Sequence, residues 1–286
     1  MLNLFELYGK QIAKRRLENP IYKPKNIGAS RFGLCPRQTI LMFTDESRNQ
    51  KSTEEIMQEE AMFRVAKMLE IDYARQWKKA GVLFSHNAWT SEGLPEGFVC
   101  QIDYLLRDQG VWKAVEFKAS HPNVMNYTDN LPKAHNILQA ETEVYSLKGM
   151  GIECKEYCVI YVSRGGGGKP FECWRKVDWS KLSVNVEMEI SKLKNFKEEY
   201  DREGNLPPML DRQLTLRKEK ENQAIKLEPN WQCNPQYCPF NGQPSCQPNM
   251  QTNKIATLYK GGQIKIRKGY EVWTKQVQEF CKPKSL

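Results

Sequence analysis

Two segments with the side-chain alternation of β-strands, joined by a short polar turn, constrain the fold of this chain most strongly. Residues 98–106 and 111–119 alternate between apolar and polar side chains, and Asp108-Gln109-Gly110 separates them. Alternate side chains of a β-strand point to opposite faces, so each run is typical of a strand. The turn predicts that the two strands form an antiparallel hairpin. A third strand is predicted over 81–89, a buried strand over 157–163, and helices over 53–80, 133–149 and 183–203.

This order of elements predicts an α/β protein with a central mixed sheet flanked by helices. The chain has 286 residues, enough for one large domain. We expect a single domain over 1–286 with its core at about 53–203. No run approaches the roughly 18 apolar residues of a membrane span, and the N-terminus lacks the pattern of a secretory signal. We therefore expect no membrane association and a cytoplasmic location.

The charge of the chain is unevenly distributed. Lys and Arg number 43 against 34 Asp and Glu, a net charge of +9. Residues 1–51 hold ten basic and four acidic side chains, and residues 254–286 hold eight and two, so each end carries +6. Basic ends around a slightly acidic centre are typical of a protein that holds a polyanion. A solvated basic surface without a partner is the alternative.

Three polar residues of the hairpin are predicted to meet on one face of the sheet. Asp103 and Glu116 are nearly symmetric about the turn, and Lys118 lies two residues after Glu116 on the same face. Two carboxylates are suitable oxygen ligands for a hard divalent cation. A cation there polarises a phosphoryl oxygen and activates water, and Lys118 can orient that water or stabilise phosphate charge. The alternative is an incidental, solvent-facing set of charges.

This Asp…Glu-x-Lys pattern resembles the hallmark of the PD-(D/E)XK nuclease superfamily and implies a restriction-endonuclease-like core. The resemblance implies that Asp103, Glu116 and the carbonyl of Phe117 bind Mg²⁺ or Mn²⁺. It also implies a Gln-x3-Tyr helix that supports the site. Gln139 matches its Gln, and Tyr145 is the displaced candidate for its Tyr. The upstream helical Glu of the family would be Glu60, or its neighbour Glu59.

The cysteines carry a second pattern. There are nine, an odd number, which argues against a disulfide framework. Cys35 precedes the predicted core, and Cys233, Cys238 and Cys246 follow it. This arrangement resembles the RecB-like iron–sulfur exonucleases of the CRISPR-associated Cas-four type, including members carried by phages. The resemblance implies that the four thiolates bind a [4Fe–4S] cluster joining segments 28–45 and 229–250.

The spacing of the last three cysteines, C-x4-C-x7-C, is wider than is usual in that family. Zn²⁺ in a four-cysteine site is therefore an alternative. Together the two patterns imply a metal-dependent DNA exonuclease that acts on single-stranded DNA ends in recombination, replication or repair. Two alternatives are a CRISPR adaptation factor that trims DNA and a non-catalytic DNA-binding protein with a structural zinc site. A second copy of the chain, or a replication, recombination or CRISPR adaptation protein, is a possible further partner.

Overall fold

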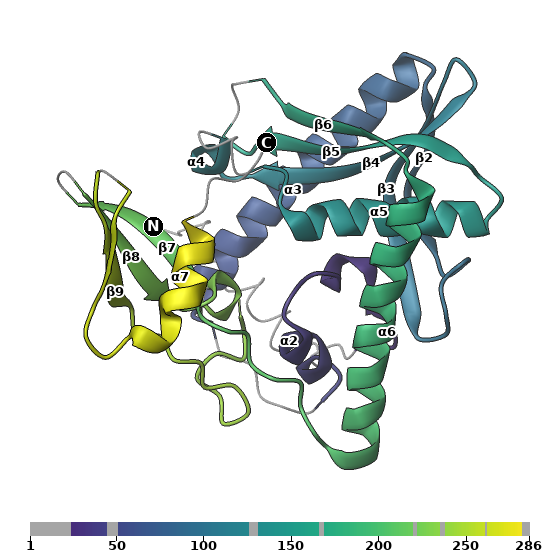
Figure 1. The fold of residues 1–286 in the computed structure, drawn as a ribbon. Helices are drawn as coiled ribbons and strands as arrows, with labels where there is room; N and C mark the ends of the chain where they lie inside the picture. Colours follow the sequence, from purple (N-terminus) through teal and green to yellow (C-terminus); the bar gives the residue numbers. More distant parts are fainter. Residues whose placement is uncertain are drawn as a thin grey trace, which may run out of the picture. The chain divides into compact units, whose positions relative to one another are not determined.

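The chain forms two compact units (Figure 1). The computed structural model describes residues 24–44, 51–125, 131–165, 169–219, 222–234, 238–260 and 262–281. Within these ranges the first unit comprises 24–44 and 51–206, and the second begins at Pro207. Most of the predicted basic N-terminal segment lies outside the described residues. Each unit is described separately below.

The first unit is built on a mixed six-stranded sheet. Its strands are β1 (Ile27–Gly28), β2 (Leu83–Thr90), β3 (Phe98–Asp108), β4 (Val111–Ser120), β5 (Cys154–Ser163) and β6 (Phe171–Lys176). Their order is β1-β3-β4-β5-β6, and β2 also pairs with β3. The β2–β3, β3–β4 and β5–β6 pairs are antiparallel, whereas β4–β5 and β1–β3 are parallel. The predicted central mixed sheet is confirmed.

Helices cover both faces of this sheet (Figure 1). The long ones are α3 (Thr53–Lys79), α5 (Ala134–Gly149) and α6 (Trp179–Glu203), and the short ones are η1 (Ala29–Arg31), α2 (Pro36–Leu41) and α4 (Pro122–Met125). Apolar side chains of α5 and α6 pack on one face, and those of α3 pack on the other. The start of α3 is set by a capping box between Ser52 and Glu55. Among the described residues, no helix combines the length and apolar character that a membrane crossing requires.

The β3–β4 hairpin creates the position of the candidate site. Its turn contains Gln109 and Gly110, both with positive φ (49° and 82°), as a two-residue type I′ turn requires. Pairing between β3 and β4 runs from Asp108–Val111 to Tyr104–Val115, where it ends. Beyond that point β4 continues its pairing with β5. A fork therefore opens between β3 and β4 beyond the Tyr104–Val115 pair, where Asp103 and Glu116 lie.

The second unit is a four-stranded antiparallel sheet with one short helix. Its strands are β7 (Gln213–Glu219), β8 (Asn222–Glu228), β9 (Asn253–Leu258) and β10 (Ile264–Ile266), in the order β10-β9-β8-β7. The helix α7 (Thr274–Phe280) follows η4 (Glu271–Trp273) and contributes Val277 to a small apolar core. The segment between β8 and β9 contains η3 (Trp231–Cys233) and the last three predicted cysteine ligands.

Candidate active site

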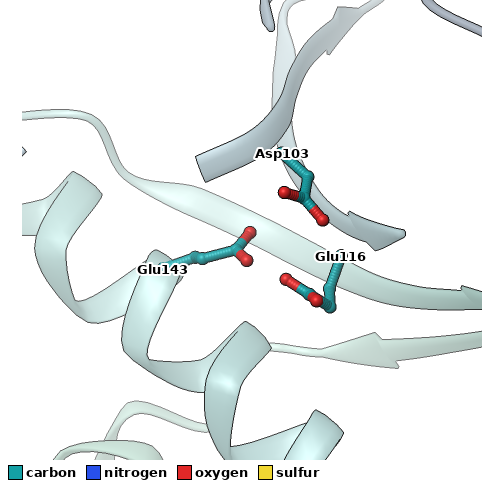
Figure 2. Close-up of side chains that lie close together, drawn as sticks. All are labelled: Asp103, Glu116 and Glu143. Carbon is teal, nitrogen blue, oxygen red and sulfur yellow. The ribbon is translucent and has the colours of Figure 1, made fainter. Parts of the chain in front are cut away.

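Three carboxylates from three different elements meet at the fork between β3 and β4. They belong to Asp103 on β3, Glu116 on β4 and Glu143 on α5, and they point toward one another (Figure 2). One oxygen from each lies within 4.8 Å of the oxygens of the other two. The side chain of Asp103 also accepts a hydrogen bond from the backbone N–H of Phe117 at 2.9 Å. This bond holds the Asp103 carboxylate in the opening between the strands.

The burial of this cluster is incompatible with an ordinary solvated set of charges. Glu116 and Glu143 are both 0% exposed. The Lys118 ammonium contacts Glu116. Otherwise, among the residues that the structure describes, no donor forms a hydrogen bond with the carboxylate oxygens of Glu116 or Glu143. Buried carboxylates without donors are costly unless a cation accompanies them. Together with Asp103, they form a donor set that fits a hard divalent cation.

The electrostatics follow from this crowding. Burial raises the pKa of the Asp103 carboxyl well above its ordinary value, and the neighbouring Glu116 raises it further. Burial, followed by Glu116, likewise raises the pKa of Glu143. Both shifts have the direction expected for like charges enclosed in a medium of low dielectric constant. A bound divalent cation would stabilise the ionised carboxylates and so lower the pKa of both groups.

Lys118 provides the one ammonium in contact with the cluster among the described residues. Burial lowers the pKa of Lys118, but the neighbouring Glu116, Asp103 and Glu143 together outweigh burial, and the net shift of the pKa is upward. The side chain therefore remains a cation at neutral pH. Its Nζ also donates a hydrogen bond to Oε1 of Gln139 on α5 at 2.9 Å. Gln139 thus fixes the ammonium beside the carboxylates.

The structure brings together four of the residues singled out from the sequence and places two others elsewhere. Asp103, Glu116, Lys118 and Gln139 converge at the fork. The ring of Tyr145 instead stacks on Trp179 with centroids 5.6 Å apart, and its hydroxyl donates to Glu187. Glu60 lies on α3, where it pairs with Arg64 on an exposed part of the helix.

Phe117, the predicted carbonyl ligand, lies between Glu116 and Lys118 at the fork. Its side chain packs in the core on the α3 face of the sheet. Its backbone N–H makes the contact with Asp103 described above. The backbone of Phe117 on β4 is therefore linked across the fork to Asp103 on β3.

Two acidic residues near the site were missed by sequence reasoning. Glu143 lies four residues after Gln139, on the same face of α5, so helical spacing was the signal that pointed to it. Glu70 on α3 accepts from Lys67 and Asn87 and contacts His86, and its charge raises the pKa of Asp103. No spacing rule distinguishes Glu70 from the other acidic residues of that helix.

The four predicted cluster cysteines are divided between the two units. Cys35 is buried in the first unit, immediately before α2. Cys233, Cys238 and Cys246 are buried in the second. A hydrogen bond with Cys246 lowers the pKa of Cys238 to about 6, and the backbone N–H groups of Phe240 and Asn241 act in the same direction. The Cys238 sulfur thus has the surroundings of a thiolate.

Comparisons with solved structures find matches at low sequence identity. No family model matches the sequence, and no curated protein matches it either. An alkaline exonuclease (LHK-Exo) from Laribacter hongkongensis matches with a TM-score of 0.40 and 14% identity, covering 64% of this chain and 94% of that one. LHK-Exo in complex with dAMP matches with a TM-score of 0.38 and 14% identity, covering 64% and 95%. Similarity at this level does not establish a shared activity, which must be inferred from the site residues.

Proposed function

We propose that the protein is a metal-dependent deoxyribonuclease that hydrolyses phosphodiester bonds at the fork between β3 and β4. The observation that carries the proposal is the cluster of Asp103 with the buried carboxylates of Glu116 and Glu143, with Lys118 in contact with it. A structural role explains this arrangement poorly, because three carboxylates share one ammonium and buried charges that are not fully paired destabilise a fold. A site that binds a divalent cation and a phosphate explains both the carboxylates and the lysine.

Each residue has a distinct task in this proposal. Asp103 and Glu116, with the carbonyl of Phe117, would hold Mg²⁺ or Mn²⁺. The cation supplies Lewis-acid polarisation of the phosphate and lowers the pKa of bound water. Lys118, a cation held by Gln139, stabilises the charge that develops on the phosphoryl oxygens. Gln139 acts as a positioning residue, because it reaches the site through Lys118.

The test is DNA cleavage by the wild type and by Asp103→Asn with Mg²⁺, Mn²⁺ or EDTA. We expect cleavage by the wild type only when a divalent cation is present, and a loss of at least about 100-fold in the variant. Binding of the same DNA, measured by fluorescence anisotropy, should persist in the variant. If the wild type binds DNA but cleaves none under any metal condition, the protein is a non-catalytic DNA-binding protein and the proposal fails.

We further propose that the substrate is DNA with free ends, and single-stranded ends in particular. The net charge of +9 suits a polyanion, and the resemblance to RecB-like exonucleases favours ends. A linear and a circular single strand of the same sequence separate the two modes of cleavage. An exonuclease degrades the linear strand and leaves the circle intact. Equal loss of both strands would show endonucleolytic cleavage, and a blunt duplex tests the strand preference.

Finally, we propose that Cys35, Cys233, Cys238 and Cys246 bind a [4Fe–4S] cluster with a structural role. The surroundings of the Cys238 sulfur and its contact with Cys246 support metal ligation in the second unit. Anaerobically purified protein should show a broad absorption band and about four iron atoms per chain, as this cluster type requires. Cys238→Ser should lose both. One zinc per chain in colourless protein would favour the alternative four-cysteine zinc site.

A further inference from the structure

An indole ring lies unusually exposed beside the candidate active site. Trp89 on β2 has 66% of its surface exposed. It pairs directly with Gln101 on β3, two residues before Asp103. Residues directly opposite in an antiparallel pair lie on the same face, with Cβ atoms about 5 Å apart. Trp89 therefore lies on the face of Gln101, whose amide reaches Asn87 and through it Glu70 on α3. Two residues along a strand cover about 7 Å, so the backbone of this pair lies close to that of Asp103.

The backbone that carries Trp89 is held by a network of side-chain hydrogen bonds. Asn87, two residues earlier, has a φ of 55°, in the left-handed region that non-glycine residues seldom adopt. Its amide nitrogen donates to Glu70 at 2.6 Å, and its oxygen accepts from Gln101 at 2.6 Å. His86 contacts Glu70 as well and stacks on the ring of Tyr104.

This network fixes the backbone that presents the Trp89 ring to solvent. It ties β2 to α3 and to the part of β3 that precedes Asp103. A strained backbone residue that is fixed from several sides is more common near functional sites than elsewhere. A platform for stacking must be held in place, because a mobile ring would lose entropy when a base binds. Lys67, which pairs with Glu70, adds a cation beside the same network.

We propose that Trp89 stacks on an unpaired base of the nucleic-acid strand that enters the fork. This inference rests on the proposed nuclease function and specifies how that site holds its substrate. Every base has a π-face, so stacking holds the strand without reading its sequence. A base within a duplex is already stacked on its neighbours and would not present its face to the ring. The platform therefore selects nucleotides that are single-stranded at the site of cleavage.

The test measures equilibrium binding of a fluorescein-labelled oligothymidylate in EDTA, where the proposed cleavage cannot proceed. The proteins are the wild type, Trp89→Ala, Trp89→Phe and the control Trp174→Ala, which removes another exposed tryptophan, on β6. We expect Trp89→Ala to raise Kd about 5- to 100-fold, the range for loss of one stacked base. Trp89→Phe should retain most of the affinity, and the control should bind like the wild type.

The same proteins are then compared on an oligonucleotide that has abasic sites in place of its bases. Because it offers no base to stack, the wild type and Trp89→Ala should bind it equally. The inference is overturned if Trp89→Ala binds oligothymidylate like the wild type, or if it loses the same factor on the abasic strand. It is also overturned if the substitution changes only self-association in sedimentation velocity, which would make a second copy of the chain the occupant.

Cleavage of the same oligonucleotide with Mn²⁺ separates this inference from the proposed function. Cleavage by the wild type together with unchanged binding by Trp89→Ala refutes the platform and leaves the nuclease. Base-dependent binding through Trp89 without any cleavage refutes the nuclease and leaves the platform as a binding site. Far-ultraviolet circular dichroism melts of each variant identify any loss of folding, and Trp89→Phe then carries the test.

Discussion

Replacing Glu143 with Gln removes one charge from the buried cluster and keeps the shape of the side chain. The ligand oxygens of Glu143, Asp103 and Glu116 all lie within 4.8 Å of one another. At that separation and an effective dielectric constant of about 20, two like charges repel by roughly 3.5 kcal/mol. Glu143 takes part in two such pairs. Protonation relieves part of this repulsion, at about 1.4 kcal/mol for each unit of pKa shift.

We therefore expect Glu143→Gln to stabilise the metal-free protein by about 2 kcal/mol at pH 8, well below the full Coulomb sum. For a unit of this size, that corresponds to an increase in Tm of about 4–8 °C. Excess Mn²⁺ should then reverse the order of the two proteins. A cation at 100 times its Kd stabilises the wild type by about 2.7 kcal/mol, and a variant with one ligand fewer gains less.

The assay is differential scanning calorimetry of both proteins in EDTA and in Mn²⁺. Glu141→Gln is the matched control on the same helix. Glu141 is also buried, but its oxygens accept hydrogen bonds from Tyr157 and Asn185, so its substitution should lower Tm under both conditions. If Glu143→Gln lowers the Tm in EDTA and shows the same Mn²⁺ shift as the wild type, the reasoning about an electrostatically strained metal site is refuted.

Three further predictions concern the same unit. Lys118→Met should reduce cleavage by about 100- to 1,000-fold in a gel assay, yet keep a Mn²⁺-induced rise in Tm; loss of that rise would make Lys118 structural. Tyr145→Phe should lower stability by about 1 kcal/mol or less, and Glu60→Gln should have no measurable effect; reduced cleavage by either would place that residue in the site. Asp103 and Glu143 have raised pKa values in the folded state, whereas the unfolded chain releases these protons at ordinary values of 3.8 and 4.5. Their contribution to the free energy of unfolding without metal should therefore be fully present below pH 3.8 and be lost as the pH rises through their pKa values in the folded state. Urea titrations at several pH values measure this free energy. An increase in the metal-free value from pH 5 to pH 8 would contradict the prediction.

Local patterns were sufficient to predict the hairpin and the residues that it carries. Alternation along 98–106 and 111–119 assigned side chains to faces, and the turn at Gln109-Gly110 set the register, with Tyr104 opposite Val115. That register brings Asp103 beside Glu116, as the symmetry about the turn predicted. The strand period of two residues then placed Lys118 on the same face. These inferences depended only on contacts between near neighbours in sequence.

The second unit shows where such patterns were not recognised. The β7–β8 hairpin was not predicted, although Leu214, Leu216, Ile225 and Leu227 alternate with polar residues. Most of the residues between them are charged, so the sequence of β7 and β8 resembles that of a solvated segment. Its apolar side chains are buried only by packing against β9 and α7.

Local sequence patterns are sufficient to specify the pairing of β3 with β4 and the convergence of Asp103, Glu116 and Lys118. Which side chains of distant helices complete the site depends on how those helices pack. Both Glu143 and Tyr145 lie on α5, but the packing of that helix on the sheet directs Glu143 into the cluster and Tyr145 toward Trp179. Helical periodicity defines the faces of a helix, whereas the contacts between elements decide which face meets the sheet. Burial, which raises the pKa values of Asp103 and Glu143, arises only when those elements pack together.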